Sequence, residues 1–171
     1  GIGFFGAGVG TDAKNSNVNV INLGPGGVGL PDRDYYVSDE KDSKEKREKY
    51  VLHVAKMLQY LGDKPEQAKA NAEKILALEI EMSKPRFDRV ERRDRRKSYN
   101  PRTVAEIQKL TPSIDWTTYF TKIGLPTNQT IIVSQPKYMT ALETLFKENK
   151  VDDWKAYMRW TLLNRSSGRL S

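Results

Sequence analysis

From residue 38 onward, apolar residues recur at the three- and four-residue spacing of amphipathic α-helices. The first predicted helix begins near Ser38 or Asp39 and ends before Gly62, and Pro65 is suited to the first position of the next helix. Six helices are predicted in all, over residues 38–61, 65–83, 103–110, 114–123, 137–149 and 152–167. We therefore expect a mainly α fold.

The first 36 residues follow a different pattern, because they hold most of the 12 glycines and two short apolar stretches, at residues 3–9 and 18–23. This composition predicts strand and loop. Residues 17–23 and the β-branched run 130–133 are predicted to be short strands that can pair with each other. The expected fold is a multi-helix lobe over residues 37–171, with a short two-stranded β element and a glycine-rich strand and loop segment, residues 1–36, that enters it.

The composition excludes several kinds of site. The 171 residues include no cysteine and one histidine, His53, so the chain can build neither a disulfide framework nor a zinc site with two imidazoles. Two G-x-G-x-x-G matches, at residues 1–6 and 24–29, lack the strand before and the helix after that nucleotide binding requires. We predict no catalytic, cofactor or metal residue in this chain, and no apolar run is long enough to span a membrane.

The net charge of +7 is concentrated in one segment. Residues 86–97 contain seven basic and three acidic residues. A basic run of this kind fits an independent helical module that binds nucleic acid or an anionic protein. The acidic residues within the run favour a solvated face or an internal ion-pair network instead, and they make nucleic-acid binding the less favoured interpretation.

Glu79 falls within the apolar stripe of the helix predicted over residues 65–83. An unpaired carboxylate is costly to bury, so we expect an internal salt bridge. The nearby basic run offers Arg92 or Arg93 as the partner.

Several unusual strings occur in a fixed order along the chain. They are Gly10-Thr-Asp-Ala-Lys-Asn-Ser16, Gly29-Leu-Pro-Asp-Arg-Asp-Tyr-Tyr36, Arg92-Arg-Asp94 with Tyr99-Asn100, Ile114-Asp-Trp116 with Tyr119, Ile131-Ile-Val133 with Pro136 and Tyr138, and Trp154-Lys-Ala-Tyr157 with Trp160 and Leu163. With these motifs the chain closely resembles the neprilysin, endothelin-converting enzyme and oligopeptidase O family of zinc metallopeptidases. One departure is Arg95, which stands where that family often has proline.

The resemblance implies a two-lobed zinc metalloendopeptidase of which this chain is a fragment. The chain resembles the helical, non-catalytic lobe that closes as a lid over the peptide-binding cavity and limits substrate size. Zinc and its ligands would lie outside the fragment, its partners would be the catalytic lobe of the same chain and peptide substrates, and the enzyme would work outside the cytoplasm, in the periplasm or at the cell surface.

On this interpretation, the charged residues have two expected roles. A structural charge network is expected to fix turns and helix packing inside the lobe, and its members are Arg33, Asp34, Glu79, Arg92, Arg93 and Asp94. Arg95 and Arg96 are candidates to face the cavity and attract the carboxylates of peptides. A lobe cut from a larger enzyme should also expose an apolar patch that normally faces the missing half.

Overall fold

A computed structural model describes residues 4–170 of the chain, and the side chains of residues 4–165. The glycines at positions 1 and 3 of the first G-x-G-x-x-G match lie outside the described residues. Within them, the chain forms two compact units, one made of residues 4–26 and 85–147 and the other of residues 27–84 and 148–170. Each unit combines segments that are distant in sequence, so this division differs from the sequence-based one at residue 36.

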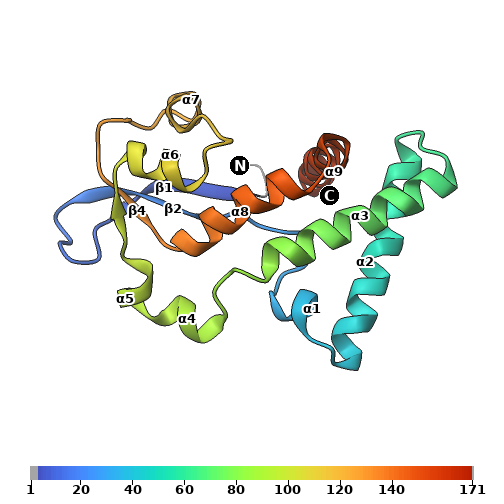
Figure 1. Ribbon diagram of the computed structural model, residues 1–171. Helices are drawn as coiled ribbons and strands as arrows, with labels where there is room; N and C mark the ends of the chain where they lie inside the picture. Colours follow the sequence, from blue (N-terminus) through green and yellow to red (C-terminus); the bar gives the residue numbers. More distant parts are fainter. Residues whose placement is uncertain (1–3, 171) are drawn as a thin grey trace. The chain divides into compact units, whose positions relative to one another are not determined.

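The first unit contains a four-stranded sheet with the order β1-β2-β4-β3. Figure 1 labels three of its strands, β1, β2 and β4. Its strands are β1 (Phe5–Thr11), β2 (Asn19–Pro25), β3 (Pro101–Arg102) and β4 (Ile131–Val133). The predicted pairing of residues 17–23 with residues 130–133 is confirmed, because β2 and β4 are parallel neighbours with Ile21 opposite Ile131. The sheet is wider than the expected two strands, because β1 and β3 pair antiparallel to β2 and β4 respectively.

Alternation of side chains explains how β2 lies in this sheet. Ile21 and Leu23 are buried on one face, whereas Asn22 between them is exposed. All three residues of β4 are buried, as expected for a central strand. Gly10 of β1 allows a close approach to β2, since a Cβ at this position would lie 2.7 Å from the amide nitrogen of Asn22.

Five helices complete the described part of the first unit: α4 (Arg89–Arg93), α5 (Arg95–Ser98), α6 (Val104–Leu110), α7 (Trp116–Lys122) and α8 (Pro136–Glu148). Thr103 and Glu106 form a capping box at the start of α6, and Asp115 caps α7 by accepting the backbone N–H of Thr118. The ring of Trp116 packs against Phe5 of β1 at 4.7 Å between centroids. Aromatic packing therefore holds α7 on the sheet.

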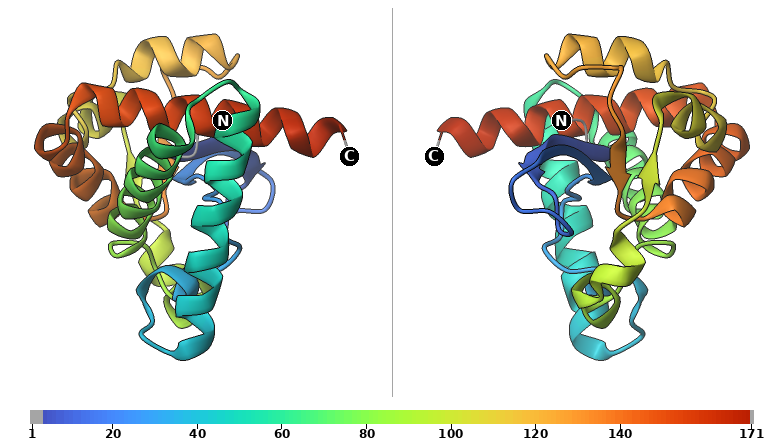
Figure 2. Two further views of the ribbon diagram at one scale, coloured as in Figure 1. Left: turned by 90° about the vertical axis from the view of Figure 1, so that its right-hand side faces the viewer. Right: turned by 90° about the vertical axis from the view of Figure 1, so that its left-hand side faces the viewer.

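The second unit contains α1 (Asp34–Val37), α2 (Lys41–Tyr60), α3 (Pro65–Ser83) and α9 (Val151–Leu170). A tight turn containing Gly62, with φ +102°, joins α2 to α3, and Pro65 is the first residue of α3 as predicted. α1 lies beside the beginning of α2, and α9 packs on α3 (Figure 2).

All six predicted helices are confirmed, with ends within three residues of the prediction, and the fold is mainly α. The short helices α1, α4 and α5 were not predicted. None of the helices among the described residues is long and apolar enough to cross a bilayer.

Candidate functional site

The carboxylate of Glu79 on α3 is the centre of a buried polar cluster in the second unit. Glu79 is only 1% exposed. One carboxylate oxygen, Oε1, accepts hydrogen bonds from the hydroxyls of Tyr50 at 2.5 Å and Tyr36 at 3.2 Å. The other, Oε2, accepts from the backbone N–H of Gly29 at 2.9 Å and from the hydroxyl of Tyr157 at 3.1 Å. We call these five residues the Glu79 cluster.

Two further hydrogen bonds orient two of the three tyrosine hydroxyls of this cluster, those of Tyr50 and Tyr36. The hydroxyl oxygen of Tyr50 accepts the indole N–H of Trp160 at 3.0 Å, and that of Tyr36 accepts the backbone N–H of Leu30 at 2.7 Å. These two hydroxyls therefore each receive one hydrogen bond and direct their own protons at Glu79. Residues from α1, α2, α9 and the segment before α1 thus meet at one side chain of α3.

The electrostatics of Glu79 are those of a buried carboxylate held by neutral donors. Burial raises its pKa, and the hydrogen bonds from Tyr50, Gly29, Tyr157 and Tyr36 offset part of this effect. Burial and the neighbouring Glu79 carboxylate also raise the pKa of Tyr50. Four donors already bind its two oxygens, so the role of this carboxylate is structural.

The predicted salt bridge from Glu79 to Arg92 or Arg93 is wrong. Both arginines lie in the last turn of α4 and are exposed. Tyrosine hydroxyls take the place of a guanidinium because they pack as apolar rings and still present a donor at the tip.

Gly29 is required by its close approach to Tyr50. A Cβ at position 29 would lie 1.9 Å from the hydroxyl oxygen of Tyr50 and 2.3 Å from the adjacent ring carbon. Any side chain at position 29 would displace the ring of Tyr50, whose hydroxyl is hydrogen-bonded to Glu79. Gly29 and Tyr36, the two ends of the string Gly29 to Tyr36 in the sequence, therefore both belong to the Glu79 cluster.

Arg33 and Asp34 lie between these two residues and have separate roles. The guanidinium of Arg33 donates to the backbone carbonyls of Ser83 at 3.0 Å and Lys84 at 2.9 Å, at the carboxyl end of α3. A cation is favourable there because the last carbonyls of a helix carry partial negative charge. Asp34 is exposed in the first turn of α1. Arg33 thus fixes helix packing through carbonyl groups and does not pair with Asp34.

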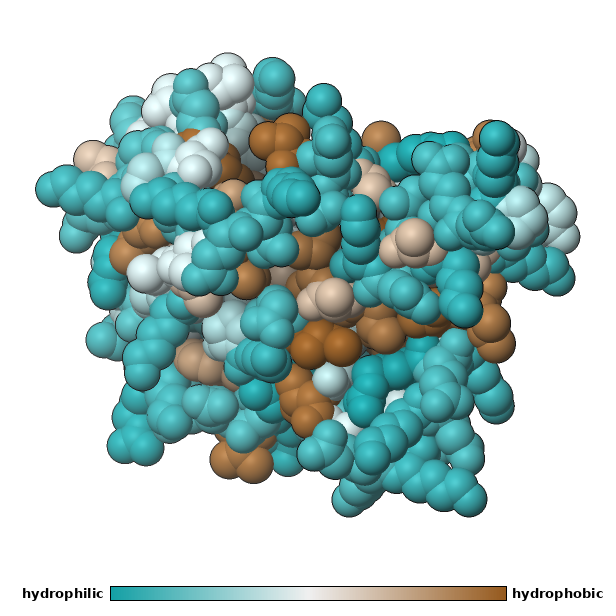
Figure 3. Space-filling view, turned by 45° about the vertical axis from the view of Figure 1, so that its right-hand side comes forward, coloured by the Kyte–Doolittle hydropathy of each residue, from teal (hydrophilic) through white to brown (hydrophobic). Residues whose placement is uncertain are grey.

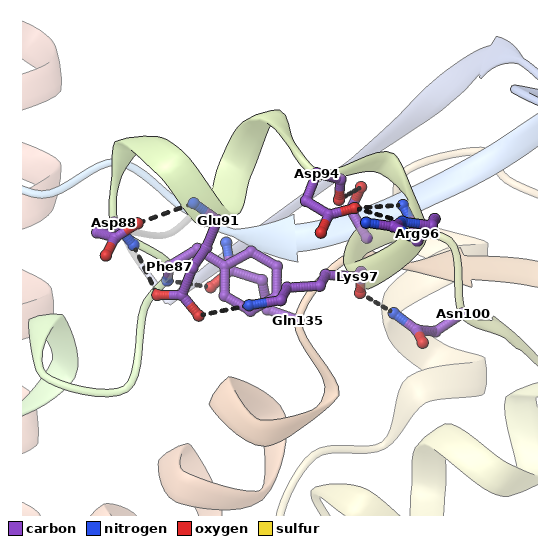
Figure 4. Close-up of polar contacts among 9 residues, drawn as sticks. Phe87, Asp88, Glu91, Asp94, Arg96, Lys97, Asn100 and Gln135 are labelled. Carbon is purple, nitrogen blue, oxygen red and sulfur yellow. Dashed lines mark hydrogen bonds and ion pairs between the residues drawn. The ribbon is translucent and has the colours of Figure 1, made fainter.

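In the first unit, the acidic residues of the basic run cap its two short helices (Figure 4). Asp88 and Glu91 form a capping box at the start of α4, and Glu91 also lies 3.8 Å from the ammonium of Lys97. Asp94 caps α5 by accepting the backbone N–H of Arg96 at 3.0 Å, and its carboxylate lies 3.4 Å from the Arg96 guanidinium. Desolvation alone would raise the pKa of Asp94. The hydrogen bonds and the charge of Arg96 outweigh desolvation and keep this pKa below its usual value.

Most arginines of this run are exposed rather than internal, but Arg86 is half-buried and donates to the backbone carbonyl of Gly26 at 2.6 Å. Arg92, Arg93, Arg95 and Arg96 all present their side chains to solvent. Arg95 is the first residue of α5, directly after the cap Asp94, and proline also fits that position of a helix. The departure from the family pattern at Arg95 is therefore compatible with the same turn.

Other motif residues tie the run to the sheet. The side-chain amide of Asn100 donates to the carbonyls of Lys97 at 2.7 Å and Val133 at 3.0 Å. The hydroxyl of Tyr99 donates to the carboxylate of Asp12 at 3.1 Å, which joins two of the motifs found in the sequence. These side chains act in packing within the unit.

No group of three or more His, Cys, Asp and Glu side chains among the described residues is arranged to hold a metal ion. The described part of this chain therefore contains no ligand set that fits the zinc implied by the sequence resemblance.

Comparisons with known proteins agree with the family resemblance seen in the sequence. The family model described as "Peptidase family M13" matches residues 1–171. Endothelin-converting enzyme 1 of Cavia porcellus is 31% identical over 98% of this chain, and Neprilysin-3 of Drosophila melanogaster is 24% identical over the same share. The zinc metalloprotease ZMP1 of Mycobacterium tuberculosis, in a structure described as an open state, superposes with a TM-score of 0.86 and 31% identity over 94% of this chain.

These relatives are much longer than this chain. The match covers 23% of each of the two enzymes named and 25% of the ZMP1 chain. Over its full length, this chain belongs to peptidase family M13 and corresponds to the amino-terminal, non-catalytic part of that family.

Proposed function

We propose that this chain is the helical lid lobe of a zinc metalloendopeptidase that cleaves oligopeptides, and that it encloses the peptide-binding cavity and limits the size of the substrate. The observation that carries the proposal is the match of the whole chain to family M13, together with the 31% identity to a zinc metalloprotease of known structure. The described residues supply packing and helix caps, which suits a lobe that covers a catalytic centre located elsewhere.

The solved structures of one relative support a closing motion. ZMP1 is described in an open state, in a partially open state and in complex with an inhibitor. A protein that opens and closes needs parts that move as rigid bodies. The Glu79 cluster supplies such rigidity in the second unit, because it joins three helices and the Gly29 to Tyr36 segment to α3.

The partners of the lobe follow from the same proposal. Zinc would be bound by the catalytic lobe of the same polypeptide, where a metal ion activates water and polarises the peptide carbonyl. The ligand of the closed cavity would be an oligopeptide. On the family resemblance, we place the enzyme outside the cytoplasm.

The complete gene provides the first test. A His-Glu-x-x-His motif encoded beyond Ser171 is expected, and the purified full-length protein should hydrolyse unstructured peptides. A chelator should abolish this hydrolysis and added zinc should restore it. Hydrolysis that persists in the chelator, or a complete sequence without the motif, would contradict the proposal.

Within the lobe, we propose that Arg95 and Arg96 face the cavity and attract acidic groups of the substrate. Their exposed guanidinium groups support this role. In the full-length enzyme, the double variant Arg95→Gln/Arg96→Gln should lower kcat/KM for acidic peptides more than for neutral peptides. The matched control Arg92→Gln/Arg93→Gln removes two exposed arginines of α4 and should leave the ratio unchanged. Equal loss for both peptide classes in the first variant would contradict the role.

The same exposed arginines support a second candidate, a basic module that binds nucleic acid or an anionic protein. Phosphate binding must weaken steeply as salt rises. A salt-dependent shift of the full-length protein with an oligonucleotide would favour this candidate, and the lid proposal predicts no such shift.

A further inference from the structure

Within residues 151–165, where its side chains are described, α9 exposes apolar residues along one face. Most of the surface visible in Figure 3 is hydrophilic, with apolar side chains exposed in a few places. Among the described residues, a shallow groove of about 590 Å³ runs along α9 and the end of α2. We call it the α9 groove, and its apolar lining consists of Leu61, Val151, Trp154, Met158, Leu162 and Leu163. Val151 is 68% exposed and Leu162 59%.

The centre of the groove lies opposite the face by which α9 packs on its own unit. Val151, Met158 and Leu162 are separated by seven and eleven residues, close to two and three helical turns, so they share one narrow arc. Tyr157 and Trp160 point away from this arc and are fully buried. A helix that is apolar on opposite sides is typical of a buried helix. The second face of α9 is therefore built to be covered.

The polar surroundings of the groove argue for a macromolecular partner. Binding pockets for small molecules combine an apolar wall with a few polar groups that converge on the ligand. Here the two polar side chains are Lys155 and Arg159, and Arg159 is already held at 2.9 Å by both carboxylate oxygens of Asp63. Lys155 is exposed at the edge of the groove. An apolar surface with a carboxylate opposite Lys155 is the complementary partner.

We infer that the α9 groove is the docking surface for another part of the same M13 polypeptide, which lies outside residues 1–171. The inference rests on the proposed function in treating this chain as part of a longer enzyme. The length of the relatives supports it, because the chain accounts for only 22 to 25% of them. The rest of such a polypeptide is tethered to this lobe, so it meets the groove at a high effective concentration.

Thiol labelling of the full-length enzyme tests the inference. The 171 residues contain no cysteine, so single replacements place new thiols at chosen positions of the lobe. Leu162→Cys lies in the groove, and Asp152→Cys is the control, since Asp152 is exposed on the same helix outside the groove lining. The maleimide labelling rate of each native variant is divided by its own rate in denaturant, after subtraction of the parent enzyme's background.

A docked groove predicts that Leu162→Cys is labelled at least about tenfold more slowly than Asp152→Cys on this scale. Val151→Cys should be protected in the same way, which keeps the test valid if Leu162→Cys fails to fold. Equal labelling in and outside the groove would overturn the inference. So would protection that disappears on dilution, which indicates a second copy, or protection that requires lipid vesicles, which indicates a membrane. Peptide hydrolysis is measured separately, so an inactive enzyme with a protected groove would refute the proposed function alone.

Discussion

Removing the hydroxyl of Tyr50 should destabilise the second unit strongly. Tyr50→Phe deletes the 2.5 Å hydrogen bond to Glu79 and the acceptor of the Trp160 indole N–H. Loss of a hydrogen bond to a charged group costs about 1.5 to 3 kcal/mol, and an unsatisfied buried N–H adds about 1 to 3 kcal/mol. Because both groups are buried, little water can replace the lost contacts. We expect the free energy of unfolding to fall by about 3 kcal/mol.

Urea denaturation followed by tryptophan fluorescence measures this loss, since Trp160 lies against the site of the change. The midpoint should fall while the m-value stays constant. Tyr60→Phe is the matched control, because Tyr60 is on the same helix and 74% exposed, and its effect should remain within about 0.5 kcal/mol. If Tyr50→Phe changes stability no more than Tyr60→Phe, the hydrogen-bond network around Glu79 is wrongly described.

Three further predictions concern local features of the fold. Gly29→Ala forces a Cβ to within 1.9 Å of the Tyr50 hydroxyl oxygen and should cost about 3 kcal/mol, whereas Gly27→Ala meets no atom within 4 Å, so thermal melting of the two variants should differ clearly. Burial raises the pKa of Glu79, so the folded chain keeps this proton at a pH where the unfolded chain has lost it. The stability of the parent relative to Glu79→Gln should therefore fall as pH rises from the unfolded-state pKa of Glu79 through its raised folded-state pKa. A rise in relative stability over this pH range in urea titrations would refute the idea that burial dominates the pKa of Glu79. Asp115→Ala should lower stability by about 1 kcal/mol through loss of the α7 cap, whereas Asp115→Asn should retain most of it.

The long helices could be predicted from sequence because their signals are local. Pro65 at the start of α3 and the threonine and aspartate caps of α6 and α7 lie within a few residues of the bonds they form. The short helices α4 and α5 lack an apolar stripe, and alternating glycines obscure β1. Periodicity therefore detects an element only when that element has one face to bury.

Only part of the Glu79 cluster could be predicted from the sequence. Helical spacing correctly placed Glu79 on a buried face, because that requires only the pattern of its own helix. Its partners Gly29, Tyr50 and Tyr157 are 50, 29 and 78 residues away, and no local pattern encodes such contacts. A buried carboxylate favours a charged partner such as arginine, whereas the fold uses tyrosines that also fill the core.

Size selection in the full-length enzyme tests the lid most directly. A short peptide that the enzyme cleaves is compared with the same sequence in an exposed loop of a stably folded protein, and with that protein after unfolding. The account predicts efficient cleavage of the free peptide and of the unfolded protein, and at least about a hundredfold lower kcat/KM for the folded protein, because a closed cavity cannot admit it. Similar kcat/KM values for all three substrates would contradict the enclosing role of this lobe.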